Sequence, residues 1–229
     1  FTTIEYAIRE GRRVYRNIQK VIQFLVAGNI AEILILLLAG VFGWEMPILA
    51  VHILLINLAT DSLPAVALGV DPASANIMKH KPIKSGTLFE KGMIYRIVLH
   101  GLFISAAALA AYWIGMLVYE NHDESMTMTF IVLSVSQLSH ALNQRSNTDS
   151  IFKRGQGHNK FLAIALLASA AIVALVVFVP PLMRLFDLVY IGWTEWLICI
   201  GLSVFPLVAV EISKIFIRLY AKHGKTVQK

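Results

Sequence analysis

Long apolar stretches alternate with short polar and charged ones along the whole chain. Six of the apolar stretches reach about twenty residues, which at 1.5 Å per residue is enough to cross the roughly 30 Å hydrocarbon core of a bilayer. The loops between them are short, so the helices are expected to form one bundle. The pattern predicts an all-α, polytopic membrane protein, a bundle of six transmembrane helices over about 18–43, 47–69, 92–119, 126–145, 160–180 and 194–219.

The composition supports a membrane protein and disfavours a soluble domain. Hydrophobic residues make up 57% of the chain, charged residues only 15%, and the mean hydropathy is +0.69. The fourth stretch is the most polar of the six and is expected to depend on packing against its neighbours. The chain begins at Phe1 without Met and without a signal or transit peptide, which predicts a fragment of a longer protein.

The net charge of +6 is divided unevenly between the two sets of loops. The basic residues precede the first span, lie in the loops after the second and fourth spans, or follow the sixth, and Arg184 alone falls in the other set. By the positive-inside rule, both termini are expected to be cytoplasmic. Topology and lipid headgroups account for the basic loops, so a bilayer is the expected partner and nucleic acid is not.

The segment before the first span is charged but keeps a helical pattern. Residues 1–17 are therefore predicted to form a cytoplasmic stalk that continues into a six-helix transmembrane domain over 18–229. The outer turn at 43–47 forces the first two spans into an antiparallel hairpin.

The second span contains the sequence Asn57-Leu-Ala-Thr60-Asp61-Ser-Leu-Pro64. An ionised aspartate in hydrocarbon is costly and usually functional. Pro64 has no N–H, and its ring clashes with the carbonyl of Thr60, four residues earlier. The helix is therefore expected to be unwound near Thr60 and Asp61, with free carbonyl oxygens beside a carboxylate. Transporters hold cations near mid-membrane in this way.

A second polar pair, Asn29 and Glu32, lies in the first span. The two residues share a helix face, as do Asn57 and Asp61. Both pairs lie about ten to fourteen residues from the outer turn, so the faces can meet roughly 15–20 Å from the outer surface. Their side chains offer only oxygen ligands, which hard cations such as Ca²⁺ prefer.

A purely structural interpretation of these residues stays open. Buried polar side chains often only join neighbouring helices by hydrogen bonds. For Gln137, His140 and Asn143 of the fourth span, taken alone, this explanation is better than metal binding. It is weaker for Glu32 and Asp61, because no Lys or Arg lies at their depth.

Four stretches of the chain resemble type II P-type ATPases: Phe1-Thr-Thr-Ile, residues 10–20, Gly28-Asn-Ile-Ala-Glu32 and residues 56–69. The similarity is greatest to calcium pumps of the sarcoplasmic-reticulum type and their bacterial relatives. The Asn-Leu-x-Thr-Asp-x-Leu-Pro motif is its most specific part. The resemblance is strong through residue 90 and weaker beyond, and it implies that the six spans are the fifth to tenth transmembrane helices of a pump.

The resemblance also implies a set of ligands for two Ca²⁺ sites, both of which include Asp61. Gln137 stands where the animal pump has a glutamate ligand, which puts a complete first site in question. Without that charge, we hypothesise one ion per cycle rather than two, because an uncompensated buried charge is costly. The candidate metal ligands are Asn29, Glu32, Asn57, Thr60, Asp61 and Gln137.

The expected function is that of the cation-translocating membrane half of an ATP-driven calcium pump in a bacterial plasma membrane. Ca²⁺ would be the transported ion. The sequence has no Asp-Lys-Thr-Gly phosphorylation motif, so ATP and Mg²⁺ would act only through missing domains. Those domains and the missing N-terminal helices would be its partners. Alternatives are a P-type pump for Na⁺ or another cation, and a secondary cation/proton exchanger, although an exchanger would often show an internal repeat and none is evident.

Overall fold

The computed structural model describes residues 2–73, 77–79, 88–89, 92–146 and 159–226, with side chains described as far as residue 216. All the secondary-structure elements found in these residues are helices, which confirms the prediction of an all-α fold. The elements, in chain order, are α1 (Thr2–Phe42), α2 (Ala50–Leu55), η1 (Ile56–Asp61), α3 (Ser62–Gly69), η2 (Ile77–Lys79), α4 (Met93–Val118), α5 (His122–Asn143), α6 (Lys160–Phe178), α7 (Pro180–Leu185) and α8 (Trp193–Thr226).

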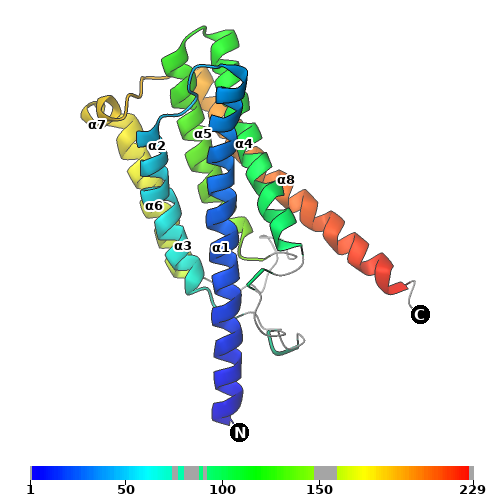
Figure 1. Cartoon of the computed structure of the whole chain (residues 1–229). Helices are drawn as coiled ribbons and strands as arrows, with labels where there is room; N and C mark the ends of the chain where they lie inside the picture. Colours follow the sequence, from blue (N-terminus) through cyan, green and yellow to red (C-terminus); the bar gives the residue numbers. More distant parts are fainter. Residues whose placement is uncertain (1, 74–76, 80–87, 90–91, 147–158, 227–229) are drawn as a thin grey trace.

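Helix α1 runs unbroken for 41 residues, and its first turns extend below the bundle (Figure 1). It contains no proline, so nothing in its backbone interrupts the hydrogen-bond ladder. The helix ends at Phe42. Gly43 follows with a φ of +67°, which suits glycine, and the Trp44 amide donates to the Ala39 carbonyl at 2.9 Å. The helix is continuous from Thr2 through the first apolar span. The division into a stalk and a membrane domain at residue 17 stays a prediction.

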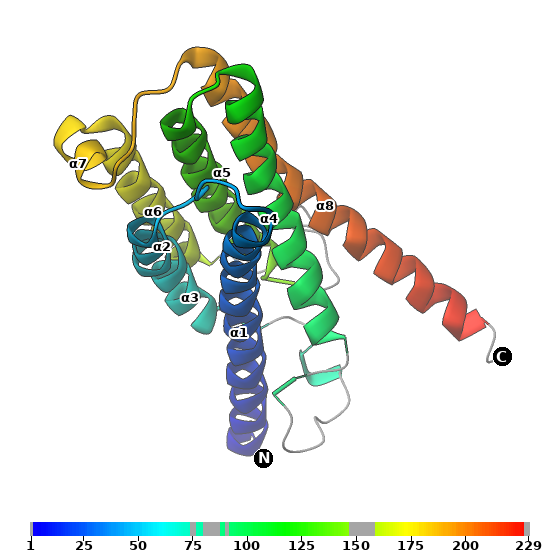
Figure 2. The same ribbon diagram turned by 45° about the horizontal axis from the view of Figure 1, so that its top comes forward.

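The helices form two groups that meet along α1 and α5 (Figures 1 and 2). On one side α4 packs against α1, α5 and α8, and α5 also packs against α8. On the other side α3 packs against α1 and α6. The main apolar core lies between these helices and includes Ile35, Ile104, Phe130 and Leu133, each fully buried.

Five units of the described chain are long and apolar enough to cross a membrane: α1, the α2–η1–α3 segment, α4, α6 and α8. They confirm a polytopic membrane protein. Helix α5 is too polar to be counted with them, as expected of the fourth span, yet it lies inside the bundle. It begins at His122, four residues before the predicted start, because the Asn121 side chain caps the amides of Asp123 and Glu124.

Polar side chains in the first turns of α5 are accommodated by local hydrogen bonds and close packing. Thr127 and Thr129 donate to carbonyls one turn earlier, at 2.9 and 2.8 Å. A Cβ on Gly115 of α4 would lie 2.7 Å from the Cα of Ser125, so this glycine lets the two helices approach closely.

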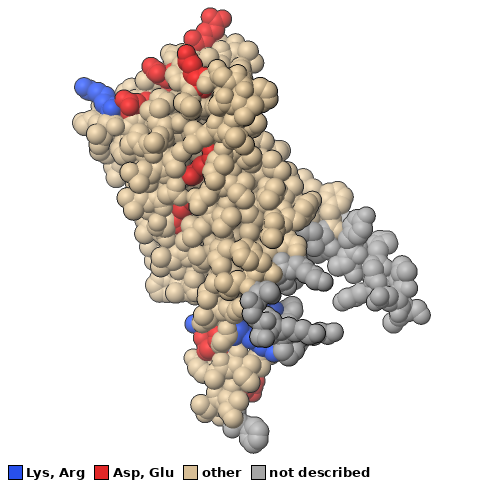
Figure 3. Space-filling model, viewed as in Figure 1, with Lys and Arg blue, Asp and Glu red and all other residues tan. Residues whose placement is uncertain are grey.

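Charged side chains gather at the two ends of the body. Figure 3 shows a cluster of acidic side chains at the upper end, and basic side chains mainly around the lower part of α1. Acidic atoms also appear half-way along the otherwise uncharged body (Figure 3). Many of the basic residues used to predict the topology lie outside the described residues or side chains: Lys79, Lys81, Lys84, Lys91, Lys153, Arg154, Arg218, Lys222, Lys225 and Lys229.

Candidate cation site

The second span widens into a π-helical turn over Ile56–Asp61, which ends three residues before Pro64. The sequence predicted an unwound helix near Thr60 and Asp61. In the structure the distortion is a π-helical turn, and the segment stays helical on both sides of Asp61. Hydroxyl groups explain the difference, because they bond carbonyls of the turn. Thr60 Oγ1 donates to the Ile56 carbonyl at 2.7 Å, and Ser62 Oγ donates to the Asn57 carbonyl at 2.8 Å. The proline is thus accommodated by a wide turn rather than a break.

Three spans meet at this turn through side-chain hydrogen bonds. Asn57 Nδ2 donates to Glu32 Oε2 at 3.1 Å, which confirms that α1 and the second span bring their polar faces together. Gln137 of α5 donates from Nε2 to Glu32 Oε1 at 3.2 Å and accepts from Thr60 Oγ1 at 3.1 Å. We call Glu32, Asn57, Thr60, Asp61 and Gln137 the central cluster.

Asp61 differs from the rest of the central cluster. Its side chain is 1% exposed, and neither carboxylate oxygen has a hydrogen-bond partner among the described residues. None of the ion pairs among the described residues involves Asp61 or Glu32. Buried polar atoms in folded proteins are nearly always paired, and an unpaired carboxylate costs more than the unpaired hydroxyls of Ser134 and Ser136, so Asp61 is a candidate for binding a cation.

Gly28 is a residue of this site that the sequence analysis did not single out. A Cβ at this position would lie 3.2 Å from Asp61 Oδ2 and 3.2 Å from Gln137 Nε2. The missing side chain leaves space beside the orphaned carboxylate. The available signal was a glycine inside an apolar helix, one turn before Glu32, where alanine would favour the helix more.

Asn29 is the one predicted ligand that the structure does not bring into the central cluster. Its side chain is exposed, whereas Glu32, Thr60, Asp61 and Gln137 are buried and Asn57 is half-buried. No hydrogen bond links Asn29 to those five residues. The i and i+3 positions share a face only broadly, since three residues advance a helix by about 300° rather than a full turn.

The chemistry of the central cluster suits a hard cation. It offers two carboxylates, two carboxamides and a hydroxyl, and no imidazole or thiol lies within it. In the described part of the chain, no group of three His, Cys, Asp or Glu residues could hold a metal. Oxygen-rich sets of this kind are typical of Ca²⁺ rather than of zinc or copper.

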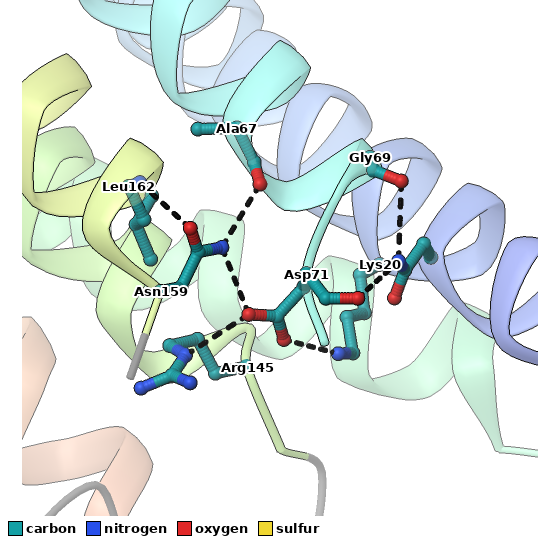
Figure 4. A network of polar contacts seen from close by, with 8 residues as sticks. Lys20, Ala67, Gly69, Asp71, Arg145, Asn159 and Leu162 are labelled. Atoms are coloured by element: carbon teal, nitrogen blue, oxygen red, sulfur yellow. Dashed lines mark hydrogen bonds and ion pairs between the residues drawn. The ribbon is translucent and has the colours of Figure 1, made fainter. Parts of the chain in front are cut away.

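A second buried aspartate, Asp71, lies just after α3 and has a full set of partners (Figure 4). Lys20 Nζ is 2.6 Å from Oδ2, and Oδ1 lies 2.9 Å from Asn159 Nδ2 and 3.4 Å from Arg145 Nε. Asn17 Nδ2 donates to the Asp71 carbonyl at 2.8 Å. We call these five residues the Asp71 junction; it ties the lower part of α1 to α3, α5 and α6.

The sequence of this chain is similar to that of known ATPases. The family described as "Cation transporting ATPase, C-terminus" matches residues 45–216. Calcium-transporting ATPase 1 of Bacillus cereus is 38% identical over 94% of this chain and 26% of its own length. The calcium-transporting ATPase of Bacillus subtilis is 37% identical over 90% of this chain and 23% of its own.

An animal protein, calcium-transporting ATPase type 2C member 1 of Pongo abelii, is 30% identical over 93% of this chain. The chain spans about a quarter of the length of these relatives. The family match covers the second to sixth apolar spans, including the π-helical turn with its orphaned carboxylate. The chain therefore belongs to the family of cation-transporting ATPase C-terminal regions.

Proposed function

We propose that this chain is the cation-translocating membrane half of an ATP-driven calcium pump. The observation that carries the proposal is Asp61, a buried carboxylate for which the described part of the chain supplies no partner to either oxygen. A Ca²⁺ ion beside it would compensate the charge and accept both oxygens as ligands. The names of the relatives support Ca²⁺ as the transported ion.

The ligands would come from the central cluster. Glu32 and Asp61 supply charge, and Asn57 and Thr60 supply neutral oxygens. Asn29 and Gln137 complete the proposed set of ligands. The side chain of Asn29 is exposed and would have to rotate to reach the ion. Gln137 bonds both Glu32 and Thr60, so it is engaged on both sides of its amide. That engagement supports a single ion, held mainly by Asn57, Asp61 and a further helix of the longer protein.

ATP and Mg²⁺ would act through domains outside this chain, since the sequence has no Asp-Lys-Thr-Gly motif. The intact protein would be a P-type ATPase. The positive-inside rule supports cytoplasmic termini, and the bacterial relatives support a bacterial plasma membrane. Helix α1, continuous from its exposed start to Glu32, would carry movement from those domains to the ion.

The test is the Asp61→Asn variant of the longer polypeptide. Asparagine keeps the size but removes the charge that offsets ion dehydration. We expect loss of Ca²⁺-dependent phosphorylation by ATP. Phosphorylation by inorganic phosphate without Ca²⁺ is expected to be retained, and it serves as the control for folding.

Normal calcium-activated turnover by Asp61→Asn would refute the assignment. The same assay separates the alternatives. Activation of the unmodified protein by Na⁺ and not by Ca²⁺ would favour a monovalent pump. Ion transport driven by a pH gradient without any phosphorylated intermediate would favour an exchanger.

A further inference from the structure

Helix α6 supplies none of the candidate ligands, yet it lies against the π-helical turn. It is the most apolar of the spans, and after Lys160 its only polar side chain is Ser169. Ser169 is 0% exposed. Its Oγ donates to the carbonyl of Ala59 at 2.6 Å, a bond between residues 110 positions apart.

The Ala59 carbonyl lies where the second span changes its hydrogen-bond pattern. The wide turn over Ile56–Asp61 gives way to α3 at Ser62, and Pro64 in the first turn of α3 has no N–H to donate. The Ser169 hydroxyl bonds a carbonyl of this stretch from α6.

The same carbonyl lies next to the orphaned carboxylate. It belongs to the peptide unit that joins Ala59 to Thr60, and Asp61 is the next residue. Because no hydrogen bond holds the Asp61 side chain, its position depends on the backbone of the turn. The hydrogen bond from Ser169 ties this part of the backbone to a helix outside the second span.

We propose that Ser169 is a positioning residue for the cation site, acting through the Ala59 carbonyl. It holds the wide turn in the geometry that aims Asp61 and Thr60 at the ion, and it touches no ion itself. This inference rests on the proposed function, because its effect is on cation binding. Preorganised ligands bind a cation more tightly than ligands that must be ordered at each binding event.

The test is Ser169→Ala in the longer polypeptide, read as the Ca²⁺ concentration that gives half-maximal phosphorylation by ATP. Loss of one buried hydrogen bond corresponds to a rise of about fivefold in that concentration. Maximal phosphorylation by inorganic phosphate without Ca²⁺ is expected to stay unchanged. Ser169→Cys keeps nearly the same size but has a weaker donor. Its half-maximal Ca²⁺ concentration is expected to lie between those of the unmodified protein and Ser169→Ala.

Ser203→Ala is the matched control. Ser203 is 2% exposed, and its Oγ donates at 2.7 Å to the Cys199 carbonyl of its own helix, α8, which supplies no residue of the central cluster. A general packing effect would shift both alanine variants equally, and that result would overturn the inference. So would an unchanged half-saturating Ca²⁺ concentration in Ser169→Ala. Failure of the proposed function is distinct, because the unmodified protein would then show no Ca²⁺ dependence.

Discussion

Asp61 and Asp71 are ten residues apart and equally hidden, yet their surroundings are opposite. Asp61 is 1% exposed and Asp71 is 3% exposed. The carboxylate of Asp71 forms ion pairs with Lys20 and Arg145 and accepts a hydrogen bond from Asn159 (Figure 4). The oxygens of Asp61 receive nothing from the described chain.

The difference shows that burial alone does not identify a functional carboxylate. A buried charge whose partners belong to the protein fixes the fold, and removing it leaves those partners unsatisfied. A buried charge without such partners is a cost to the fold, and proteins keep such groups where a ligand or proton compensates them. The Asp71 junction is thus a structural contact between helices, whereas the unpaired Asp61 supports the proposal of a cation site in the central cluster.

The largest expected effect separates the two aspartates by stability. Asp71→Asn breaks ion pairs in which Lys20 and Arg145 are 18% and 19% exposed, and breaking a buried pair costs about 3 kcal/mol. Asp61→Asn is expected to leave stability unchanged or to raise it, because an uncompensated charge disappears. Denaturant unfolding in detergent without Ca²⁺ measures both. Equal destabilisation by the two variants would remove the basis of the comparison.

A smaller effect is expected when a charge is added to the central cluster. Gln137→Glu would supply the carboxylate that a second Ca²⁺ requires, and relieving an uncompensated charge by even 1.4 kcal/mol changes affinity about tenfold. We expect equilibrium binding of radioactive calcium to rise from one ion to two per longer polypeptide. Two ions bound cooperatively by the unmodified protein would contradict the one-ion proposal.

The smallest expected effect comes from filling the space beside Asp61. A Cβ in Gly28→Ala would stand 3.2 Å from both Asp61 Oδ2 and Gln137 Nε2, so those groups must shift by a few tenths of an ångström. We expect Ca²⁺ affinity to fall about fivefold, at the lower end of overpacking costs.

Gly40→Ala is the control for Gly28→Ala. Gly40 lies in the same helix, and nothing would lie within 4 Å of an added Cβ. Both substitutions favour the helix by about 1 kcal/mol, so only the Gly28 variant is expected to lose affinity. A similar affinity in the two variants would show that the space beside Asp61 is not used by the ion.

The sequence by itself determined the helices and the depth of the charges. Long apolar stretches must become helices in hydrocarbon, because each backbone amide and carbonyl has to be satisfied within its own segment. Pro64 acts on the carbonyls directly before it, so a distortion beside Asp61 could be predicted locally. The form of the distortion could not be predicted in this way. The hydroxyls of Thr60 and Ser62 bond carbonyls of the turn, which stays π-helical instead of breaking.

Only the tertiary structure decided which side chains became partners. Gln137 reaches Glu32 across 105 residues, Ser169 reaches Ala59 across 110, and Lys20 reaches Asp71 across 51. The physical reason is that a helix fixes the direction of a side chain relative to its own axis, whereas its neighbours depend on how separate helices rotate and pack. The sequence placed two aspartates ten residues apart, and packing gave partners to Asp71 and none among the described residues to Asp61.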